Sequence, residues 1–291
     1  MDTHSLFTDA FALFNRGLAR EALDKFEQII AHESGGPKSF TSTAQMFILE
    51  CYKLIGLKHN AQNAFPLALE VFDQALRQYP GNLYLQFYRG VVLNNSGNFP
   101  GAIRTFETVQ SANPAFPAIR LCLAISLLNL GNLERTESLL RDSLSTGTPE
   151  AQAFHLMAVL RFRRHQYQDM ESLLRRALQL QPHHLEASVL LVALLLQQGQ
   201  HREAARVLAE LLVTVDDMAV LHPPLAFLKN RPEAGPDNPL AVHQLPEGVD
   251  PVVPEGSIRR WIENCFYETI WIDVHRLPFQ DREEEFFRES W

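Results

Sequence analysis

The sequence has few cysteines and lacks the short motifs of the common catalytic and metal sites. Its 291 residues include three cysteines, Cys51, Cys122 and Cys265, and no CxxC pair. Scattered thiols of this kind are typical of buried residues in a reducing compartment. There is also no Gly-rich phosphate loop, no HExxH and no GxSxG. We therefore expect no catalytic residue, no metal site and no cofactor.

The sequence also lacks an excess of positive charge and a long hydrophobic run. The formal net charge of −8 argues against a nucleic-acid partner, because phosphate binding needs a basic face. The most apolar run, Ala187 to Leu196, is shorter than the ~20 residues that cross a bilayer. The N-terminus has neither the basic region nor the apolar region of a secretory signal peptide. We expect a cytoplasmic protein that does not insert into a membrane.

What the sequence contains is a repeat of 34 residues. A small residue is followed four positions later by an aromatic residue or Leu, three later by a small or apolar residue, and five later by Pro. The copies are Ala68-Phe72-Ala75-Pro80, Ala102-Phe106-Val109-Pro114, Thr136-Leu140-Ser143-Thr148, Met170-Leu174-Ala177-Pro182 and Ala204-Leu208-Leu211-Asp216. A turn signal recurs in phase at Gly97, Gly131, His165 and Gly199, and Gly90, Ala124, Ala158 and Val192 mark the helix before it.

Each position of the repeat has a physical reason. Gly can end a helix in the left-handed conformation, small residues let two helices approach closely, and Pro stops the second helix. A sixth copy begins upstream with Gly17 and Ala22, but Ala22 and Ala68 are 46 residues apart. We expect the excess over one repeat to form two loops, around Gly35–Pro37 and at Leu57–Asn63.

With these features the sequence resembles the tetratricopeptide repeat family over about three quarters of its length. The resemblance implies an all-α fold, a right-handed superhelix of about six helical hairpins in residues 1–216. The expected repeats are 3–36, 42–82, 83–116, 117–150, 151–184 and 185–218. A Pro-rich strap at 217–256 and an aromatic, acidic segment at 257–291 form the C-terminal extension.

In this family the first helix of each hairpin lines a concave groove that binds peptides. The resemblance assigns to this groove Phe87, Val91, Leu121, Ile125, His155, Val159 and Val189. The groove is therefore expected to be apolar and to hold a hydrophobic segment or an amphipathic helix. The alternative is that some of these residues pack between hairpins instead.

A polar series accompanies the apolar one at Asn95, Asn129, Arg163 and Gln197, again 34 residues apart. Asn and Gln carry both a donor and an acceptor, so such a series could pair with the backbone of an extended peptide. Asn is also common at solvated helix ends just before a turn. The sequence favours the second interpretation.

The C-terminal extension carries most of the acidity and all three tryptophans. From Asp217 onward there are 7 Lys+Arg and 14 Asp+Glu. An amphipathic helix is expected from Ser257, continuing through Ile270 and Trp271, with Trp261, Phe266 and Trp271 as candidate docking residues. The extension could cap the last hairpin, dock to a partner or occupy the groove, and we rank the three in that order.

These observations predict a non-catalytic adaptor, chaperone or assembly scaffold that holds a partner protein, alone or as a subunit of a larger complex. The alternative is that the repeats target a small regulatory or catalytic module at residues 222–291.

Overall fold

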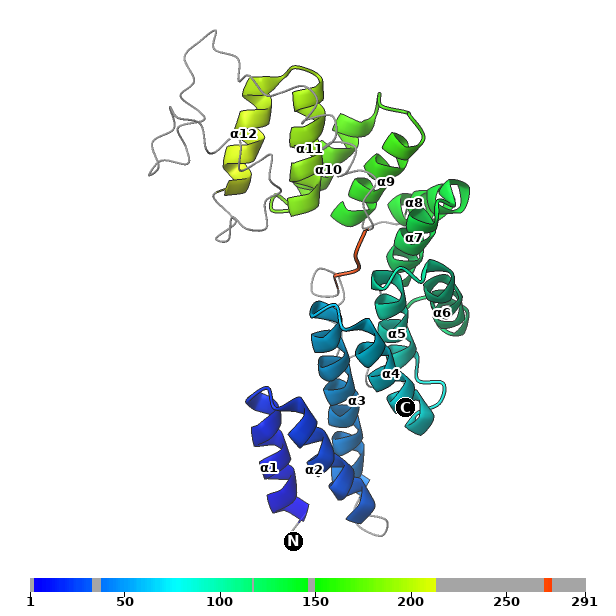
Figure 1. The fold of residues 1–291 in the computed structure, drawn as a ribbon, viewed down its shortest axis with the longest axis vertical. Helices are drawn as coiled ribbons and strands as arrows, with labels where there is room; N and C mark the ends of the chain where they lie inside the picture. The colour runs from blue at the N-terminus through cyan, green and yellow to red at the C-terminus, as the bar shows by residue number, and fades with distance from the viewer. Residues whose placement is uncertain (1–2, 33–37, 117, 146–149, 213–269, 274–291) are drawn as a thin grey trace. The chain divides into compact units, whose positions relative to one another are not determined.

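The described part of the chain folds into helices joined by turns (Figure 1). A computed structural model describes residues 3–32, 38–116, 118–145, 150–212 and 270–273, and these residues contain no β-strand. Their helices are α1 (Thr3–Asn15), α2 (Ala19–His32), α3 (Lys38–Ala61), α4 (Phe65–Gln78), α5 (Leu83–Asn95), α6 (Phe99–Ala112), α7 (Ile119–Leu130), α8 (Leu133–Ser145), α9 (Ala151–Arg163), α10 (Met170–Leu180), α11 (Leu185–Gln197) and α12 (His201–Leu212).

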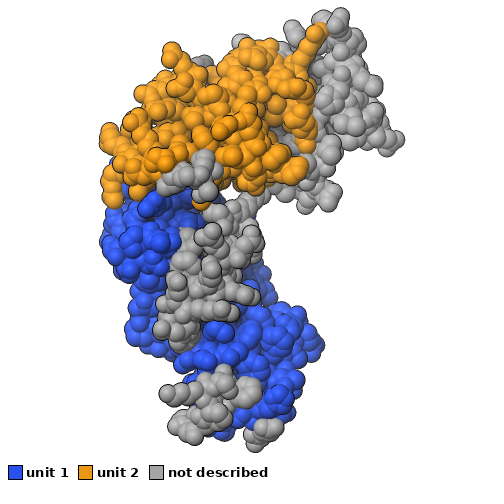
Figure 2. Space-filling model, turned by 180° about the vertical axis from the view of Figure 1, so that it is seen from behind, with its two compact units in different colours: residues 1–132, 269–291 blue, residues 133–268 orange. Residues whose placement is uncertain are grey.

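The chain divides into two compact units, shown in blue and orange in Figure 2. Unit 1 comprises Met1–Asn132 with Thr269–Trp291, and unit 2 comprises Leu133–Glu268. Within each unit every helix packs against the next one in the chain. In unit 1, α3 also contacts α5, and α5 contacts α7. The predicted all-α stack of helical hairpins is confirmed.

Each hairpin turn contains one residue in the left-handed conformation. These residues, one per copy of the repeat, are Gly17, Asn63, Gly97, Gly131, His165 and Gly199, with φ between 59° and 84°. The hydrogen bonds at each turn are the same: at α5, Gly97 N–H donates to Asn94 and Asn98 N–H donates to Leu93. This is the Schellman cap, and it confirms the predicted turn series. Asn63 completes that series, one full repeat before Gly97.

The repeat's small and large positions form the interior of the hairpins. Side chains at both positions are fully buried (0% exposed) in Ala22, Phe26, Ala68, Phe72, Ala102, Phe106, Thr136, Leu140, Met170 and Leu174. Thr136 and Met170, which depart from the small-residue pattern, therefore occupy the same buried position as the alanines. Each second helix that precedes a predicted Pro stop ends two residues before it, as α4 does before Pro80.

Close helix approach depends on two glycines that lie one repeat apart. A Cβ atom on Gly90 would lie 2.6 Å from Phe106 Cε1, well inside van der Waals contact. Gly56 faces the Phe72 ring in the same way and at a still shorter distance. The predicted role of the small residue at position 90 is confirmed, and Gly56 extends the series by one copy.

The location predicted for one of the inserted loops is wrong. Residues 57–61 belong to α3, which is 24 residues long. Compared with the repeat, α3 is extended by about three turns at its N-terminal end, so most of the extra residues are helical. The helix continues through Gly56, which gives room to the Phe72 ring.

We predict that Gly90→Ala destabilises the wild-type chain but stabilises a Phe106→Leu background. In the wild type the new methyl group overpacks against the ring, which costs about 1–3 kcal/mol. With the ring gone, Ala should gain about 0.5–1 kcal/mol from helix propensity. Urea unfolding followed by circular dichroism would measure both differences. Equal effects in the two backgrounds would contradict the Gly90–Phe106 contact.

A second prediction concerns the turn at His165. His165→Gly should raise the free energy of unfolding by roughly 0.5–1 kcal/mol, because Gly adopts a positive φ without a Cβ penalty. The exposed hydrogen bond between His165 Nδ1 and the Tyr167 hydroxyl, 2.9 Å, offsets part of this gain. The matched control, Gly131→Ala, should lower stability by about 1 kcal/mol. A destabilising His165→Gly would contradict the expectation.

Candidate functional site

Asparagine side chains of unit 1 bind the backbone of residues 270–273, the segment coloured orange-red in Figure 1. The amide of Ile270 donates to Asn129 Oδ1 at 2.9 Å, and Asn129 Nδ2 donates to the Ile270 carbonyl at 2.9 Å. One side-chain amide therefore satisfies both polar groups of one backbone residue. An adjacent β-strand pairs with a residue in the same two-point way.

Asn95 binds the next-but-one residue of the segment in the same manner. Ile272 N–H donates to Asn95 Oδ1 at 2.9 Å, and Asn95 Nδ2 donates to the Ile272 carbonyl at 3.2 Å. In an extended chain the backbone groups of alternate residues point in the same direction. Asn129 and Asn95 therefore bind residues i and i+2 of the segment, which are Ile270 and Ile272. The segment runs from α7 toward α5, opposite to the order of the helices.

Asn94 links these two contacts. Its Nδ2 donates to the Ile270 carbonyl at 3.1 Å and to Asn95 Oδ1 at 3.1 Å. Its Oδ1 accepts from Ser126 Oγ at 3.0 Å and from Asn129 Nδ2 at 3.2 Å. Asn94, Asn95 and Asn129 thus form a connected asparagine ladder in which each side chain holds the next.

Asn60, near the end of α3, completes the network. Its Oδ1 accepts from Asn95 Nδ2 at 3.3 Å. With this bond Asn95 makes two donor and two acceptor contacts, as does Asn94, so both amides use their full hydrogen-bonding capacity. Both are buried, with Asn94 0% and Asn95 6% exposed. A buried polar network is favourable when its members are satisfied, as these are.

The side chains of the segment lie in different surroundings. Ile272 is 2% exposed, whereas Trp271 is 47% exposed. The indole of Trp271 meets the Phe65 ring edge-on, with 5.8 Å between centroids. The segment is therefore held by its backbone at two residues and by an enclosed aliphatic side chain at one of them.

Asn95 and Asn129 lie at helix ends as expected, but Asn95 is buried instead of solvated, and Asn129 is half-buried and bonded to Asn94 and Ile270. Gln197, the corresponding residue of unit 2, is exposed at the end of α11, and Arg163 is half-buried at the end of α9. The helix expected through Ile270 and Trp271 is also wrong. These residues are extended because their backbone groups bond to asparagine side chains instead of to helical neighbours.

Asn60, Asn94 and Ser126 belong to the network but were not predicted from the sequence. Asn60 and Asn94 lie 34 residues apart, so they form a second in-phase series immediately before position 95. That spacing is a signal that could have found them. Ser126 has no counterpart of this kind, and only the three-dimensional contact identifies it.

The apolar residues assigned to the groove are enclosed. Phe87, Val91, Leu121 and Ile125 of unit 1 are at most 3% exposed, as are His155 and Val159 of unit 2, while Val189 is half-buried. The Phe87 ring lies 5.8 Å from the Phe106 ring and 5.1 Å from the Phe116 ring, measured between centroids. Phe87 therefore packs within its own repeat, against the second helix of its hairpin and the residues that follow that helix. Trp261 and Phe266 lie outside the described residues.

The N-terminal part of α5 faces a charged cluster rather than an apolar surface. The Tyr84 hydroxyl donates to Glu50 Oε2 at 2.9 Å, and Glu50 is also paired with Lys53. The Lys53 ammonium lies 5.6 Å from the centre of the Tyr84 ring and 5.8 Å from that of Tyr88. This cationic, aromatic arrangement gives α3 and α5 a polar contact that the predicted apolar groove did not include.

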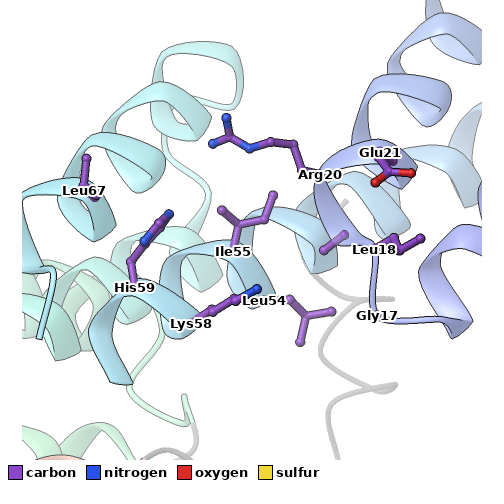
Figure 3. A pocket seen from close by; sticks show the side chains of 10 residues that line it. Gly17, Leu18, Arg20, Glu21, Leu54, Ile55, Lys58, His59 and Leu67 are labelled. Carbon is purple, nitrogen blue, oxygen red and sulfur yellow. The ribbon is translucent and has the colours of Figure 1, made fainter. Parts of the chain in front are cut away.

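Unit 1 also contains a cleft of about 670 Å³ between the α1–α2 turn, α3 and α4 (Figure 3). Leu18, Leu54 and Leu67 supply apolar lining, and Leu54 and Leu67 are partly exposed. Lys58 and Arg20 bring positive charge to the same cleft. The cleft and the asparagine ladder lie on different sides of α3, because Lys58 and Asn60 are about 200° apart around the helix axis.

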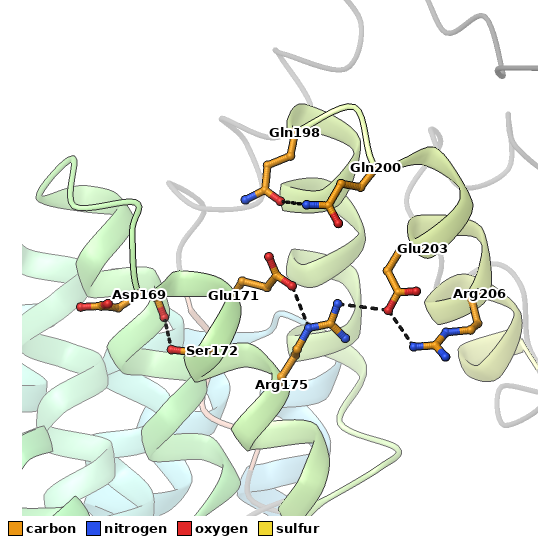
Figure 4. A network of polar contacts seen from close by, with 8 residues as sticks. All are labelled: Asp169, Glu171, Ser172, Arg175, Gln198, Gln200, Glu203 and Arg206. Carbon is orange, nitrogen blue, oxygen red and sulfur yellow. Dashed lines mark hydrogen bonds and ion pairs between the residues drawn. The ribbon is translucent and has the colours of Figure 1, made fainter.

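In unit 2 an ion-pair network connects α10 with α12 (Figure 4). Arg175 donates to Glu171 Oε1 at 2.8 Å and to Glu203 Oε1 at 3.1 Å, and Arg206 donates to Glu203 at 2.7 Å. These side chains are between 28% and 58% exposed, so each pair contributes less than about 1 kcal/mol. The network stabilises the last hairpins and brings no reactive groups together.

His155, predicted to line the groove, lies inside unit 2 beside His184. The two rings are 5.1 Å apart, and both side chains are buried. His184 Nδ1 accepts from Ala187 N–H at 3.3 Å, which leaves its Nε2 to donate to Gln152 Oε1 at 2.7 Å. Burial, followed by the neighbouring His184, lowers the pKa of His155 to about 3, and Glu186 opposes this weakly. His155 is therefore neutral at physiological pH.

Two kinds of feature are absent from the part of the chain that the structure describes. Within it, no three or more His, Cys, Asp or Glu side chains gather closely enough to hold a metal ion. The helices described above include none that combines the length and apolar character needed to cross a membrane. Of the three thiols, Cys51 and Cys122 are buried, and burial raises the pKa of Cys51 to about 12.

Sequence profiles of the tetratricopeptide repeat match residues 55–115 and 162–219. A comparison with curated proteins gave no significant match. Among solved structures, a tetratricopeptide repeat protein from Parabacteroides merdae is 14% identical, with a TM-score of 0.57 over 99% of this chain and 96% of that chain. This likeness shows a shared fold.

Shorter structures also resemble parts of the chain. MamA from Desulfovibrio magneticus is 17% identical, with a TM-score of 0.46 over 58% of this chain and 97% of that one. The protein TTC0263 of Thermus thermophilus is 16% identical, with a TM-score of 0.45 over 67% of this chain and 99% of that one.

The His155 environment predicts acid sensitivity. The pKa of His155 is lower in the folded chain than the ~6.5 of an unfolded His. The contribution of neutral His155 to the free energy of unfolding is therefore complete above pH 6.5 and is lost as pH falls toward 3. Between pH 6 and 4 the loss should be about 1.4 kcal/mol per pH unit. His155→Leu should remove this dependence.

The measurement compares the free energy of unfolding of the wild type and the variant at pH 7.5, 6 and 5 by circular dichroism. Carboxylates titrate in both chains, so only the difference between them reports on His155. His183→Leu, which removes an exposed histidine one residue before His184, is the matched control. Parallel pH curves for the wild type and His155→Leu would contradict the expectation.

Proposed function

This chain belongs to the tetratricopeptide repeat family, and we propose that it is a non-catalytic protein-binding module. In this proposal the asparagine ladder of unit 1 holds an extended stretch of a partner polypeptide. Repeat arrays of this kind present extended binding surfaces, which supports a role in protein interaction in general. The two-point contacts at Ile270 and Ile272 are the observation that carries the specific proposal.

The ladder recognises groups that every polypeptide carries. Five hydrogen bonds join Asn94, Asn95 and Asn129 to the backbone of two residues. Each contributes about 0.5–1.5 kcal/mol net, so the set can hold an extended chain without reading most of its side chains. Main-chain bonds give affinity and side-chain pockets give selectivity in other cases where a groove binds an extended peptide.

The chemistry of the ladder favours binding over catalysis. A carboxamide neither titrates near neutral pH nor acts as a nucleophile, and its donors and acceptors here are all used for positioning. The adaptor and chaperone interpretations share this binding chemistry and differ in how long the partner stays bound. The partner is then another protein with an accessible extended segment, free or within a larger complex.

The proposal is tested with a fluorescein-labelled synthetic peptide of residues 266–277 and the full chain. Asn95→Ala with Asn129→Ala should weaken binding at least tenfold, measured by fluorescence anisotropy, because four of the five backbone contacts are removed. The matched control is Asn113→Ala, which changes an asparagine at the end of α6 that bonds only locally to Ala115 N–H.

The peptide offers a second control. N-methylation at its Ile270 or Ile272 nitrogen removes a donor to the ladder and should weaken binding. N-methylation at its Trp271 nitrogen should not, since the described structure gives that amide no hydrogen bond to the ladder. Equal affinity of all three peptides, or of the ladder variant and the wild type, would refute backbone recognition by the ladder.

A further inference from the structure

We propose that residues 270–273 are a tethered competitor, so that the chain occupies its own ladder and a partner must displace this segment to bind. The inference rests on the proposed function of the ladder and adds its regulation and the kind of partner it fits. That partner carries an extended segment with an aliphatic residue at the position bound by Asn95, and it runs opposite to the order of the helices.

Binding of the segment and binding of a partner are mutually exclusive. Asn94 and Asn95 already use two donor and two acceptor contacts each. Asn129 uses both of its N–H donors, on Asn94 and on Ile270. A second extended chain would therefore find no donor available on the ladder while the segment is bound.

The burial of the segment indicates which side chains a partner needs. Ile272 is 2% exposed, so the Asn95-bound position encloses a β-branched aliphatic side chain. A charged residue there would be buried without a partner group of opposite charge among the ladder residues, which is unfavourable. Trp271 is 47% exposed and meets the Phe65 ring edge-on, so the middle position accepts varied residues and prefers aromatic ones.

The competitor gains its strength from its tether. Residues 213–269 connect the end of α12 to Ile270 in the same chain. A covalent connection of this kind holds the segment near the ladder at an effective concentration on the order of mM. For a segment with an intrinsic Kd of about 0.1 mM, this would weaken the apparent affinity of a partner roughly tenfold.

A second copy of the chain is a weaker candidate for the occupant. The segment belongs to the same compact unit as residues 1–132 of its own chain. At micromolar protein concentration a second copy would supply the same segment at about a thousandth of the tethered concentration. The proposal therefore commits to the chain's own segment.

The test uses the full chain with Ile270→Pro and Ile272→Pro, which remove the two backbone N–H donors to the ladder and leave the ladder intact. The labelled peptide of residues 266–277 should bind this variant roughly tenfold or more tightly than it binds the wild type. The matched control, Ala241→Pro with Gln244→Pro, adds two prolines elsewhere in the extension and should bind as the wild type does.

The outcomes separate this inference from the proposed function. Equal peptide affinity for the wild type and the Ile270→Pro, Ile272→Pro variant would overturn self-occupation. Adding Asn95→Ala and Asn129→Ala to that variant should abolish the gain. A gain that persists without these asparagines would refute the ladder itself. Wild-type affinity that rises on dilution of the protein would show that a second copy supplies the segment, which would overturn the intramolecular form.

Amide exchange provides an independent readout of the bound segment. NMR can follow hydrogen exchange at the Ile270 and Ile272 backbone amides. In the wild type both amides should exchange slowly, and excess unlabelled peptide should accelerate the exchange of both. The same peptide with its Ile272 equivalent replaced by Asp should not accelerate exchange, because the enclosed position excludes a charge. Fast exchange of both amides in the wild type without peptide would overturn the proposal.

Discussion

The equal geometry of the hairpins is the constraint on which the other features depend. Each first helix is followed by a turn residue with positive φ, and at α3 and α5 a glycine lets the helix approach the ring of the second helix closely. Because these contacts recur with the period of the repeat, residues one repeat apart face the same way within unit 1. Asn95 and Asn129 can therefore bind two alternate residues of one extended chain.

In the proposed function, the ladder combines general and selective recognition of a polypeptide at one place. Its amides pair with backbone groups, which any polypeptide offers, and it encloses one aliphatic side chain, which few segments offer in the right position. The sequence predicted an apolar groove that binds a partner through hydrophobic contact. In the structure, asparagine amides near the turns instead bind the backbone of residues 270–273, and Phe87 packs within its own hairpin against Phe106.

The fold was predictable because its signals are local and repeated. Turn residues such as Gly97 and Gly131 and buried positions such as Phe72 and Phe106 lie a fixed distance apart in the chain. The environment of the asparagines was not predictable in this way. The residue that covers Asn94 is Ile270, 176 positions later, and no spacing rule connects the two. For the same reason the sequence predicted a helix around Trp271: the amphipathic spacing is local, whereas the asparagines that bind this segment lie far away in the chain.

The cross-linking within the ladder has a consequence for the entropy of binding. Asn94 holds Asn95 and Asn129, Ser126 holds Asn94, and Asn60 holds Asn95, so the asparagine amides are fixed by one another as well as by their ligand. A side chain that is already ordered loses little rotamer freedom when it binds, and ordering costs about 0.5–1.5 kcal/mol for each free side chain. The site is thus preorganised, and an incoming polypeptide supplies most of the conformational entropy that association removes.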